Sequence, residues 1–131
     1  SREATKKNFE LRLLLQQSPL FLVCKLNKLD LFEAIWKKLR GYDINQQNEN
    51  GMSLLHCACS YSALPIVKFL LQFRSVDVNL KISRGKWIGW SPLLLSCLHQ
   101  EQEIVKLLLV RDDVDLNIST DKHDGLLHIL S

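Results

Sequence analysis

Three residues near the middle of the chain have the chemistry of metal ligands. His56, Cys57 and Cys59 lie close together in the sequence, and imidazole and thiolate groups are the usual ligands of zinc. On a helix, however, residues two positions apart point about 200° away from each other, so Cys57 and Cys59 could not bind the same tetrahedral ion. The pattern therefore predicts neither a metal site nor a cofactor.

The other reactive side chains do not form a pattern typical of catalysis. A cysteine nucleophile needs an exposed thiol with a lowered pKa, whereas we expect the cysteines of this chain to be reduced and buried. Asp112 and Asp113 are adjacent carboxylates, but they follow a predicted helix and we expect them in a solvated turn. The chain also lacks a glycine-rich phosphate loop. We therefore predict that it is not an enzyme and takes no small-molecule substrate.

One segment is rich in tryptophan and basic residues, which suits it to binding. Residues 80–90 read LKISRGKWIGW and contain two of the three tryptophans and three bases. Tryptophan and arginine are enriched at the hot spots of protein interfaces. We hypothesise that four side chains anchor an acidic or aromatic segment of a partner: Arg84, Lys86, Trp87 and Trp90. The alternative, which the sequence supports equally, is that one or both tryptophans pack against a neighbouring loop.

The composition indicates a folded domain. The chain has 131 residues, of which 47% are hydrophobic and 24% charged. Its net charge of +3 is too small for the concentrated basic face of a nucleic-acid-binding protein. No apolar run approaches the ~20 residues that a membrane-spanning helix needs. The four cysteines are not needed as a disulfide framework, so we expect an intracellular location. The chain does not begin with Met, and we expect it to be part of a longer protein.

Two short patterns recur along the chain and predict repeats. A serine followed by Pro-Leu or Leu-Leu begins a helix at three places, with steps of 35 and 38 residues between them: Ser18, Ser53 and Ser91. An Asp-aliphatic-Asn triplet follows each serine: Asp43–Asn45, Asp77–Asn79 and Asp115–Asn117. Recurrence at intervals of this size is the mark of a repeat protein.

Each repeat is predicted to contain two helices. Serine is a good N-cap for the first helix, which we expect to end near Cys24, Ser60 and Leu98. The second helix is predicted to begin at Asp30, Pro65 and Glu103. Its apolar residues form one stripe, which includes Trp36 as a core residue: Leu31-Phe32-Ile35-Trp36, Ile66-Val67-Leu70-Leu71 and Ile104-Val105-Leu108-Leu109. Because one pair cannot bury such a stripe alone, neighbouring pairs must stack into a solenoid.

These patterns resemble ankyrin repeats, which have units of ~33 residues and a Thr-Pro-Leu-His pattern. The resemblance is carried by four segments: Asn48–His56, Ile66–Leu71, Gly89–Leu94 and Glu103–Leu109. It implies an all-α ankyrin-repeat solenoid of helix-turn-helix units joined by β-turn fingers. It also implies that His56 and His128 tie the turn to the helix.

We expect the whole chain, residues 1–131, to form a single ankyrin-repeat domain. Its predicted parts are a helix in residues 1–16 that is a cap or a preceding repeat, a divergent repeat in 17–47, repeats in 48–79 and 80–117, and the start of a further repeat in 118–131.

The resemblance further implies that the fingers and the concave face of the first helices bind a protein or peptide, without nucleic acid or membrane insertion. One finger is unusual, because Asn79 to Gly89 is ten residues whereas Asn45 to Gly51 is six. We expect it to form a longer hairpin with a tight turn at 83–86, and we expect Trp90 to point outward. Secondary contact candidates are Met52, Tyr61, His99 and Gln100.

Three other interpretations remain open at this level. The chain could be a regulatory or substrate-targeting segment of a larger enzyme or effector whose chemistry lies elsewhere, or a structural spacer. Asn79 and Asn117 also resemble asparagines that are hydroxylated in ankyrin proteins, although ordinary repeat architecture produces the same spacing. An asparagine there more often caps the turn.

Overall fold

The computed structural model of the chain describes residues 19–117. These residues form three helix pairs: α2 (Pro19–Leu26) with α3 (Leu29–Lys38), α4 (Leu54–Ser60) with α5 (Leu64–Leu71), and α6 (Pro92–Leu98) with α7 (Gln102–Val110). No strand occurs between residues 19 and 117, so the prediction of an all-α fold is confirmed. The helix expected in residues 1–16, the further repeat expected in 118–131 and its His128 lie outside the described residues.

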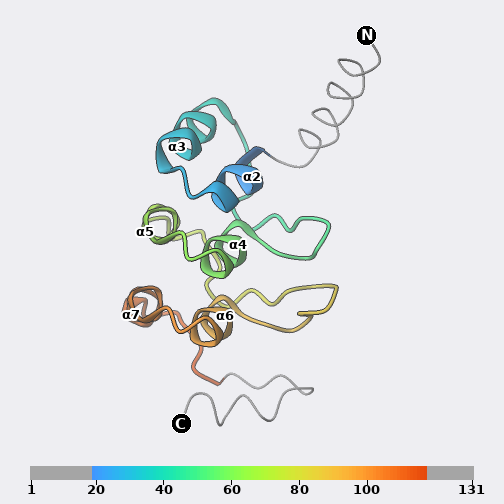
Figure 1. Cartoon of the computed structure of the whole chain (residues 1–131), viewed down its shortest axis with the longest axis vertical. Helices are drawn as coiled ribbons and strands as arrows, with labels where there is room; N and C mark the ends of the chain where they lie inside the picture. The colour runs from blue at the N-terminus through green and yellow to red at the C-terminus, as the bar shows by residue number, and fades with distance from the viewer. Residues whose placement is uncertain (1–18, 118–131) are drawn as a thin grey trace.

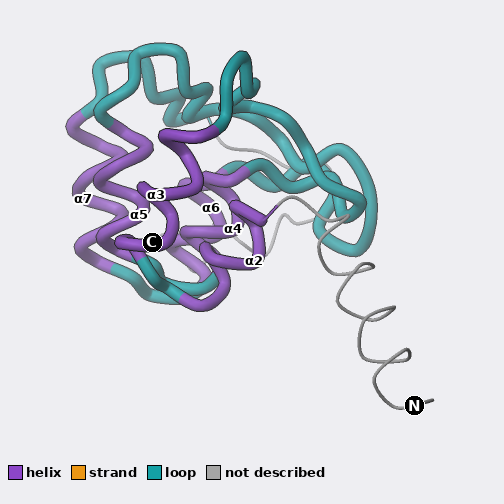
Figure 2. Tube along the Cα trace, turned by 90° about the horizontal axis from the view of Figure 1, so that it is seen from above, coloured by secondary structure: helices purple, strands orange, loops and turns teal. Residues whose placement is uncertain are grey.

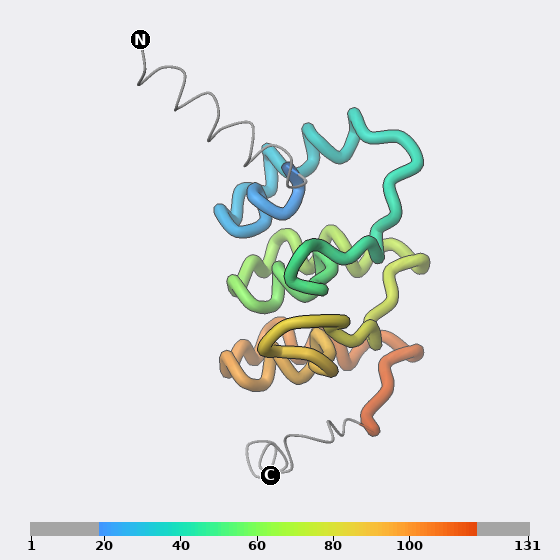
Figure 3. Tube along the Cα trace, turned by 90° about the vertical axis from the view of Figure 1, so that its right-hand side faces the viewer, coloured from blue at the N-terminus to red at the C-terminus, as the bar shows by residue number. Residues whose placement is uncertain are grey.

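The helix pairs stack in two columns (Figure 1). The first helices, α2, α4 and α6, lie one beneath another, and α3, α5 and α7 form the second column beside them. Loops project from the side away from the second column, as the view from above also shows (Figure 2). We call residues 46–52 the second finger and residues 80–90 the third finger, and these two loops lie one above the other (Figure 3). None of the described helices is long and apolar enough to cross a bilayer.

The helices begin where local chemistry favours a start. The Ser53 hydroxyl accepts a hydrogen bond from the His56 N–H at 3.3 Å, and the Ser91 hydroxyl accepts one from the Leu94 N–H at 3.2 Å. Both serines are therefore the N-caps that the sequence predicts. The second helices begin one residue earlier than predicted, at Leu29, Leu64 and Gln102, a difference within the ordinary uncertainty of helix ends.

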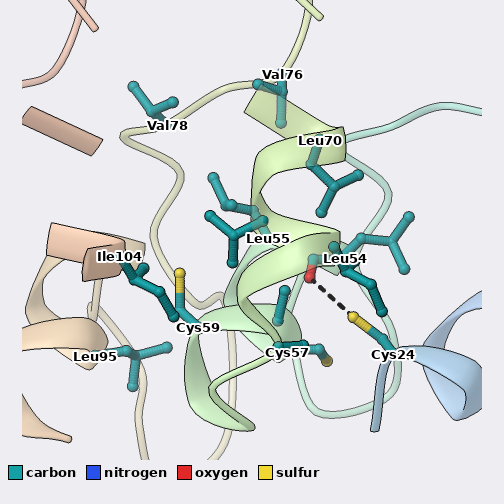
Figure 4. Packing of buried hydrophobic residues seen from close by; sticks show 14 of the residues in the cluster. Cys24, Leu54, Leu55, Cys57, Cys59, Leu70, Val76, Val78, Leu95 and Ile104 are labelled. Carbon is teal, nitrogen blue, oxygen red and sulfur yellow. Dashed lines mark hydrogen bonds between the residues drawn. The ribbon is translucent and has the colours of Figure 1, made fainter. Parts of the chain in front are cut away.

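Stacking buries one continuous apolar cluster that runs through all three pairs. It includes Leu55, Cys59, Leu95 and Ile104, which bring α4, α6 and α7 together (Figure 4). At the junction with the first pair, the Cys24 thiol contacts the Leu54 carbonyl oxygen at 3.8 Å. Since each pair covers the apolar side of the next, no pair needs a core of its own.

The predicted stripe of the second helices is only partly correct. Six of its members are fully or almost fully buried: Phe32, Ile66, Val67, Leu70, Ile104 and Leu108. Leu31 and Leu109, however, are exposed. The stripe spans about 140° of the helix, because its outermost members are five residues apart at about 100° per residue. Leu31 and Leu109 occupy its two edges, where burial ends first.

Trp36 is half-buried rather than fully buried, and it joins an aromatic cluster between α3 and α5. Its ring lies 5.4 Å from that of Phe73, 5.9 Å from those of Phe69 and Tyr42, and 6.2 Å from that of Phe32. Edge-on and offset contacts at these distances are favourable beyond the area that they bury. Trp36 therefore connects the first two repeats through its ring faces.

The Asp-aliphatic-Asn triplets provide hydrogen bonds both within a turn and between repeats. In all three, the aspartate carboxylate accepts from the N–H of the asparagine at 2.9 Å. The asparagine side chain then reaches the next repeat. Asn45 donates to the Ser75 carbonyl at 2.9 Å and accepts from the Asp77 N–H at 2.7 Å. Asn79 does the same with the Asp113 carbonyl and the Asp115 N–H, at 2.8 and 2.7 Å.

These bonds give the three triplets equivalent places along the stack. They also show that Asn45 and Asn79 do more than cap their own turns, because each satisfies one donor and one acceptor of the following repeat.

A second polar connection is made by Arg111, whose side chain is only 11% exposed. Its guanidinium forms a two-pronged pair with Asp113, at 2.9 and 2.7 Å, and this bond holds the pKa of the Asp113 carboxyl below its ordinary value. The same guanidinium donates to carbonyls just past the end of α5, including those of Phe73 and Val76 at 3.3 Å. It also donates to the carbonyl of Leu71, the last residue of α5, at 3.2 Å. Helix ends leave such carbonyls without intrahelical partners, so Arg111 completes the preceding repeat.

We predict that Arg111→Ala lowers the free energy of unfolding by about 2 kcal/mol, because it leaves several carbonyls of the preceding repeat without this donor. Arg111→Lys should recover less than half of this loss, since an ammonium cannot reproduce the planar fork. The matched control is Arg74→Ala, because Arg74 forms an ion pair with Asp112 in which both side chains are exposed. That change should cost less than about 0.5 kcal/mol. Equal losses for Arg111→Ala and Arg74→Ala in urea titrations would contradict the assignment.

Candidate binding surface

The third finger is a loop closed at its base. The Ile82 N–H donates to the Trp90 carbonyl at 2.9 Å, and the Gly89 N–H donates to the Ile82 carbonyl at 2.8 Å. Two turns follow each other at its end, closed by bonds from the Ile88 N–H to Gly85 at 3.2 Å and from the Trp90 N–H to Trp87 at 3.1 Å. The loop therefore doubles back on itself, but the tight turn predicted at 83–86 is wrong, since the turns lie at 85–90 and no residue of the finger is in a strand.

The base of the third finger rests against the second finger at Gly51. A Cβ placed on Gly51 would lie 2.5 Å from the Arg84 nitrogen, so no side chain fits there. Gly51 also has a φ of +74°, which glycine adopts without strain. Its carbonyl accepts from the Ser83 N–H at 3.1 Å and from the Gln47 side chain at 2.9 Å.

Gln47 joins the two fingers directly. Its Nε2 group also donates to the Lys81 carbonyl at 3.0 Å. Sequence reasoning missed this residue, because nothing in its type or spacing distinguishes it from the exposed Gln46 beside it. The two fingers are thus held together by main-chain and amide bonds, and the remainder of the third finger is left to the solvent.

Trp90 does not point outward, so this expectation is wrong. Its side chain is 2% exposed, and its carbonyl accepts hydrogen bonds from both Ile82 and His56. Trp90 is therefore held at the base of the third finger, because its backbone both closes the finger and contacts the preceding repeat. Its ring packs edge-on against Trp87, with centroids 4.9 Å apart and planes at 89°. The buried Trp90 ring therefore restricts the orientation of the Trp87 ring.

The exposed part of the third finger combines bases with apolar groups. Arg84 and Lys86 are exposed, and Trp87 and Ile88 are 36% and 45% exposed. The Lys86 ammonium lies 5.4 Å from the centroid of the Trp87 ring, within the range of a cation–π contact. Sequence reasoning did not single out Ile88, because a loop has no periodicity from which the direction of a side chain could be predicted.

The charge of this surface is not neutralised within the described residues. The finger contains Lys81, Arg84 and Lys86 and no acidic residue. The ion pairs found between residues 19 and 117 all lie elsewhere, at Arg74, Lys106 and Arg111. Three bases on an exposed loop create a local positive potential that an acidic partner would experience.

Three of the four secondary candidates lie apart from this surface. Tyr61, His99 and Gln100 are exposed and follow the C-terminal ends of α4 and α6, whereas the fingers lead into the N-terminal ends. Met52 is the last residue of the second finger, directly after Gly51, and is half-buried against the core. The structure therefore brings together Arg84, Lys86, Trp87 and Trp90 and places Met52 in the neighbouring loop.

His56 connects the cap of α4 to the base of the third finger. It is fully buried, and its Nδ1 accepts from the Ser53 N–H at 3.1 Å. Its Nε2 therefore carries the hydrogen, which it donates to the Trp90 carbonyl at 3.2 Å. Burial lowers the pKa of His56 from 6.5 to about 4, against opposing hydrogen bonds to Leu80 and Trp90. The tie between turn and helix expected for His56 is confirmed.

The cysteines do not have the properties of nucleophiles. Cys24, Cys57 and Cys59 are buried, and burial raises the pKa of Cys57 and Cys59 to about 12 and that of Cys24 further still. Cys97 is half-buried, so its predicted full burial is wrong, although partial burial also raises the pKa of its thiol. In the described part of the chain, no three His, Cys, Asp or Glu side chains are placed to hold a metal ion.

Comparison with known proteins agrees with this architecture. A family model described as ankyrin repeats (3 copies) matches residues 20–120. No curated protein sequence matches the chain.

We predict that His56 makes stability depend on pH between about 6.5 and 4. The unfolded chain binds a proton below pH 6.5, whereas folded His56 does so only near pH 4, so stability is complete above 6.5 and falls as the solution is acidified. One such group contributes a slope of about 1.4 kcal/mol per pH unit and a loss of about 3 kcal/mol across the window.

Urea titrations at several pH values measure this slope. His56→Gln should be less stable at neutral pH and should show a flatter profile, whereas the control His99→Gln, at an exposed position, should keep the profile of the unmodified chain. An unchanged slope in His56→Gln would rule out His56 as its source.

Proposed function

The chain belongs to the ankyrin-repeat family, whose repeats generally act as protein–protein interaction modules, and on this premise we propose that its third finger binds an acidic segment of a partner protein. The contact residues are Arg84, Lys86, Trp87 and Ile88, with Trp90 as their support. The partner segment carries carboxylates that face the bases and an apolar side chain that packs on Trp87 and Ile88. Repeats of this family are typically non-catalytic, which is consistent with a role in binding.

The single observation that carries this proposal is an exposed tryptophan held in place among unneutralised bases. Trp87 is fixed by its edge-on contact with Trp90, and Trp90 is buried. A side chain that is already ordered loses little conformational entropy when it binds, so more of the interaction energy appears as affinity. Large aromatic groups and arginine supply most of the energy at protein interfaces.

The positive charge of the third finger indicates that its partner segment is negatively charged. Its three bases carry a charge of +3, which equals the net charge of the whole chain. The charges of all other residues therefore cancel. Binding of an acidic segment by exposed bases should be fast and sensitive to salt. A lengthened loop can provide this contact without disturbing the stack, because its base is closed by Ile82 and Trp90.

Tyr61, His99 and Gln100 form a second, weaker part of the proposal. They follow the C-terminal ends of α4 and α6 in successive repeats. A partner that extends along the concave face would contact them as well. We also propose an intracellular location, which the four free cysteines favour.

Selection of peptides from a random display library on the folded chain tests the proposed function. We predict that selected peptides are enriched in Asp and Glu next to an aromatic or aliphatic residue. Trp87→Ala and the pair Arg84→Glu with Lys86→Glu should each weaken their binding about tenfold or more, or by roughly 1.4 kcal/mol. Helical content measured by circular dichroism should not change, because these side chains lie outside the helices.

The matched control reverses two exposed bases at the end of α3, Lys37→Glu with Lys38→Glu. It makes the same change in net charge and should leave affinity within about twofold, since the charges lie on another element. Selected peptides without acidic residues, or equal losses for the finger and control variants, would refute the proposal.

A further inference from the structure

The second finger contains the only Asn-Gly pair in the chain, Asn50–Gly51. An asparagine followed by glycine can lose ammonia without an enzyme, because a glycine leaves room for its own nitrogen to approach the asparagine side chain. The Gly51 nitrogen forms a bond to Cγ of Asn50, the bond from Cγ to Nδ2 breaks, and ammonia leaves with the proton of the Gly51 N–H. Water then opens the five-membered imide at either carbonyl, which produces aspartate or isoaspartate at position 50.

The folded chain restrains the nucleophile of this reaction. The Gly51 N–H donates to the Asn48 carbonyl at 2.9 Å, and the Gly51 carbonyl accepts from Ser83 and from Gln47. Asn50 itself is exposed, whereas Gly51 is buried. Because this N–H is held by Asn48, attack on Cγ requires the turn to open, with rotation of the peptide between Asn50 and Gly51.

That rotation is blocked by the third finger. The main chain of Ser83 and Arg84 lies against Gly51, within 2.9 Å of the place where a Cβ would be. Turning the peptide therefore requires the two fingers to separate, which is a local opening of the kind that limits exchange and cleavage in folded proteins.

We propose that Asn50 is a site of spontaneous deamidation, and that the docking of the third finger on Gly51 sets its rate. The reaction needs only water as a reactant, and it takes place while the second and third fingers are separated. Its rate therefore reports how often the fingers separate.

Deamidation of Asn50 also changes the charge next to the third finger. The Asn50 carbonyl oxygen lies 3.7 Å from a Cβ placed on Gly85, so the residue that gains the carboxylate is next to the third finger along the main chain. The new negative charge opposes one of the three positive charges of the finger. Isoaspartate also inserts a methylene group into the main chain just before Gly51, which shifts Gly51 from its close contact with Ser83 and Arg84. If the proposed function holds, both products weaken the capture of an acidic partner.

Peptide mapping by mass spectrometry, after incubation of the full chain in mildly alkaline buffer, tests the proposal. We expect conversion at Asn50 ahead of the other described asparagines, several-fold slower in the native chain than in the same chain unfolded in urea. Asn50→Gln should abolish the product. Gln47→Ala removes the amide that holds Gly51 and Lys81 together, and it should accelerate conversion roughly tenfold.

The matched control is Gln46→Ala, since Gln46 is exposed and removal of its side chain leaves the finger contacts intact. It should react at the rate of the unmodified chain. Equal rates in the native and unfolded chains, or equal rates in Gln47→Ala and Gln46→Ala, would overturn the proposal. These readouts involve no partner, so a failure of the peptide selection leaves them unaffected. Binding by Asn50→Asp, measured with the selected peptides, addresses the effect of the carboxylate separately.

Discussion

Three short helix pairs, none able to cover its own apolar side, must be held in register along one direction. Burial between pairs supplies the attraction, but burial alone does not fix how far one pair slides past the next. The asparagines at 45 and 79 do so, because each amide meets one carbonyl and one N–H of the following repeat. Arg111 adds a further bond at the end of α5. The position of every finger depends on this register.

Given that register, a finger can grow without cost to the stack. The third finger keeps the same base as a shorter loop would need, with Ile82 bonded to Gly89 and Trp90, and the added residues emerge beyond it. Close contact at Gly51 holds the loop against the second finger. An unusual loop is therefore compatible with a regular core.

Much of the helical architecture was predictable from the sequence, because it rests on local chemistry and short-range periodicity. Ser53 and Ser91 predict the starts of helices, and the recurring Asp-aliphatic-Asn triplets predict the repeats. Trp90 and Gln47 could not be placed in the same way. Whether Trp90 faces inward depends on bonds to Ile82 and His56, and the role of Gln47 depends on a carbonyl in another repeat. Arg111 is similar, since the carbonyls that it binds are 35 to 40 positions away in the chain.

The contacts between aromatic rings in residues 19–117 fall into two separate groups. Trp36 lies among Phe32, Tyr42, Phe69 and Phe73 between the first two repeats, whereas Trp87 and Trp90 form a pair in the third finger. Tryptophan fluorescence consequently has two structural origins. Replacing Trp36 by phenylalanine leaves emission from the loop pair alone, and replacing Trp87 and Trp90 leaves emission from the α3–α5 contact alone, so the two variants together separate a change at the repeat junction from a change in the third finger.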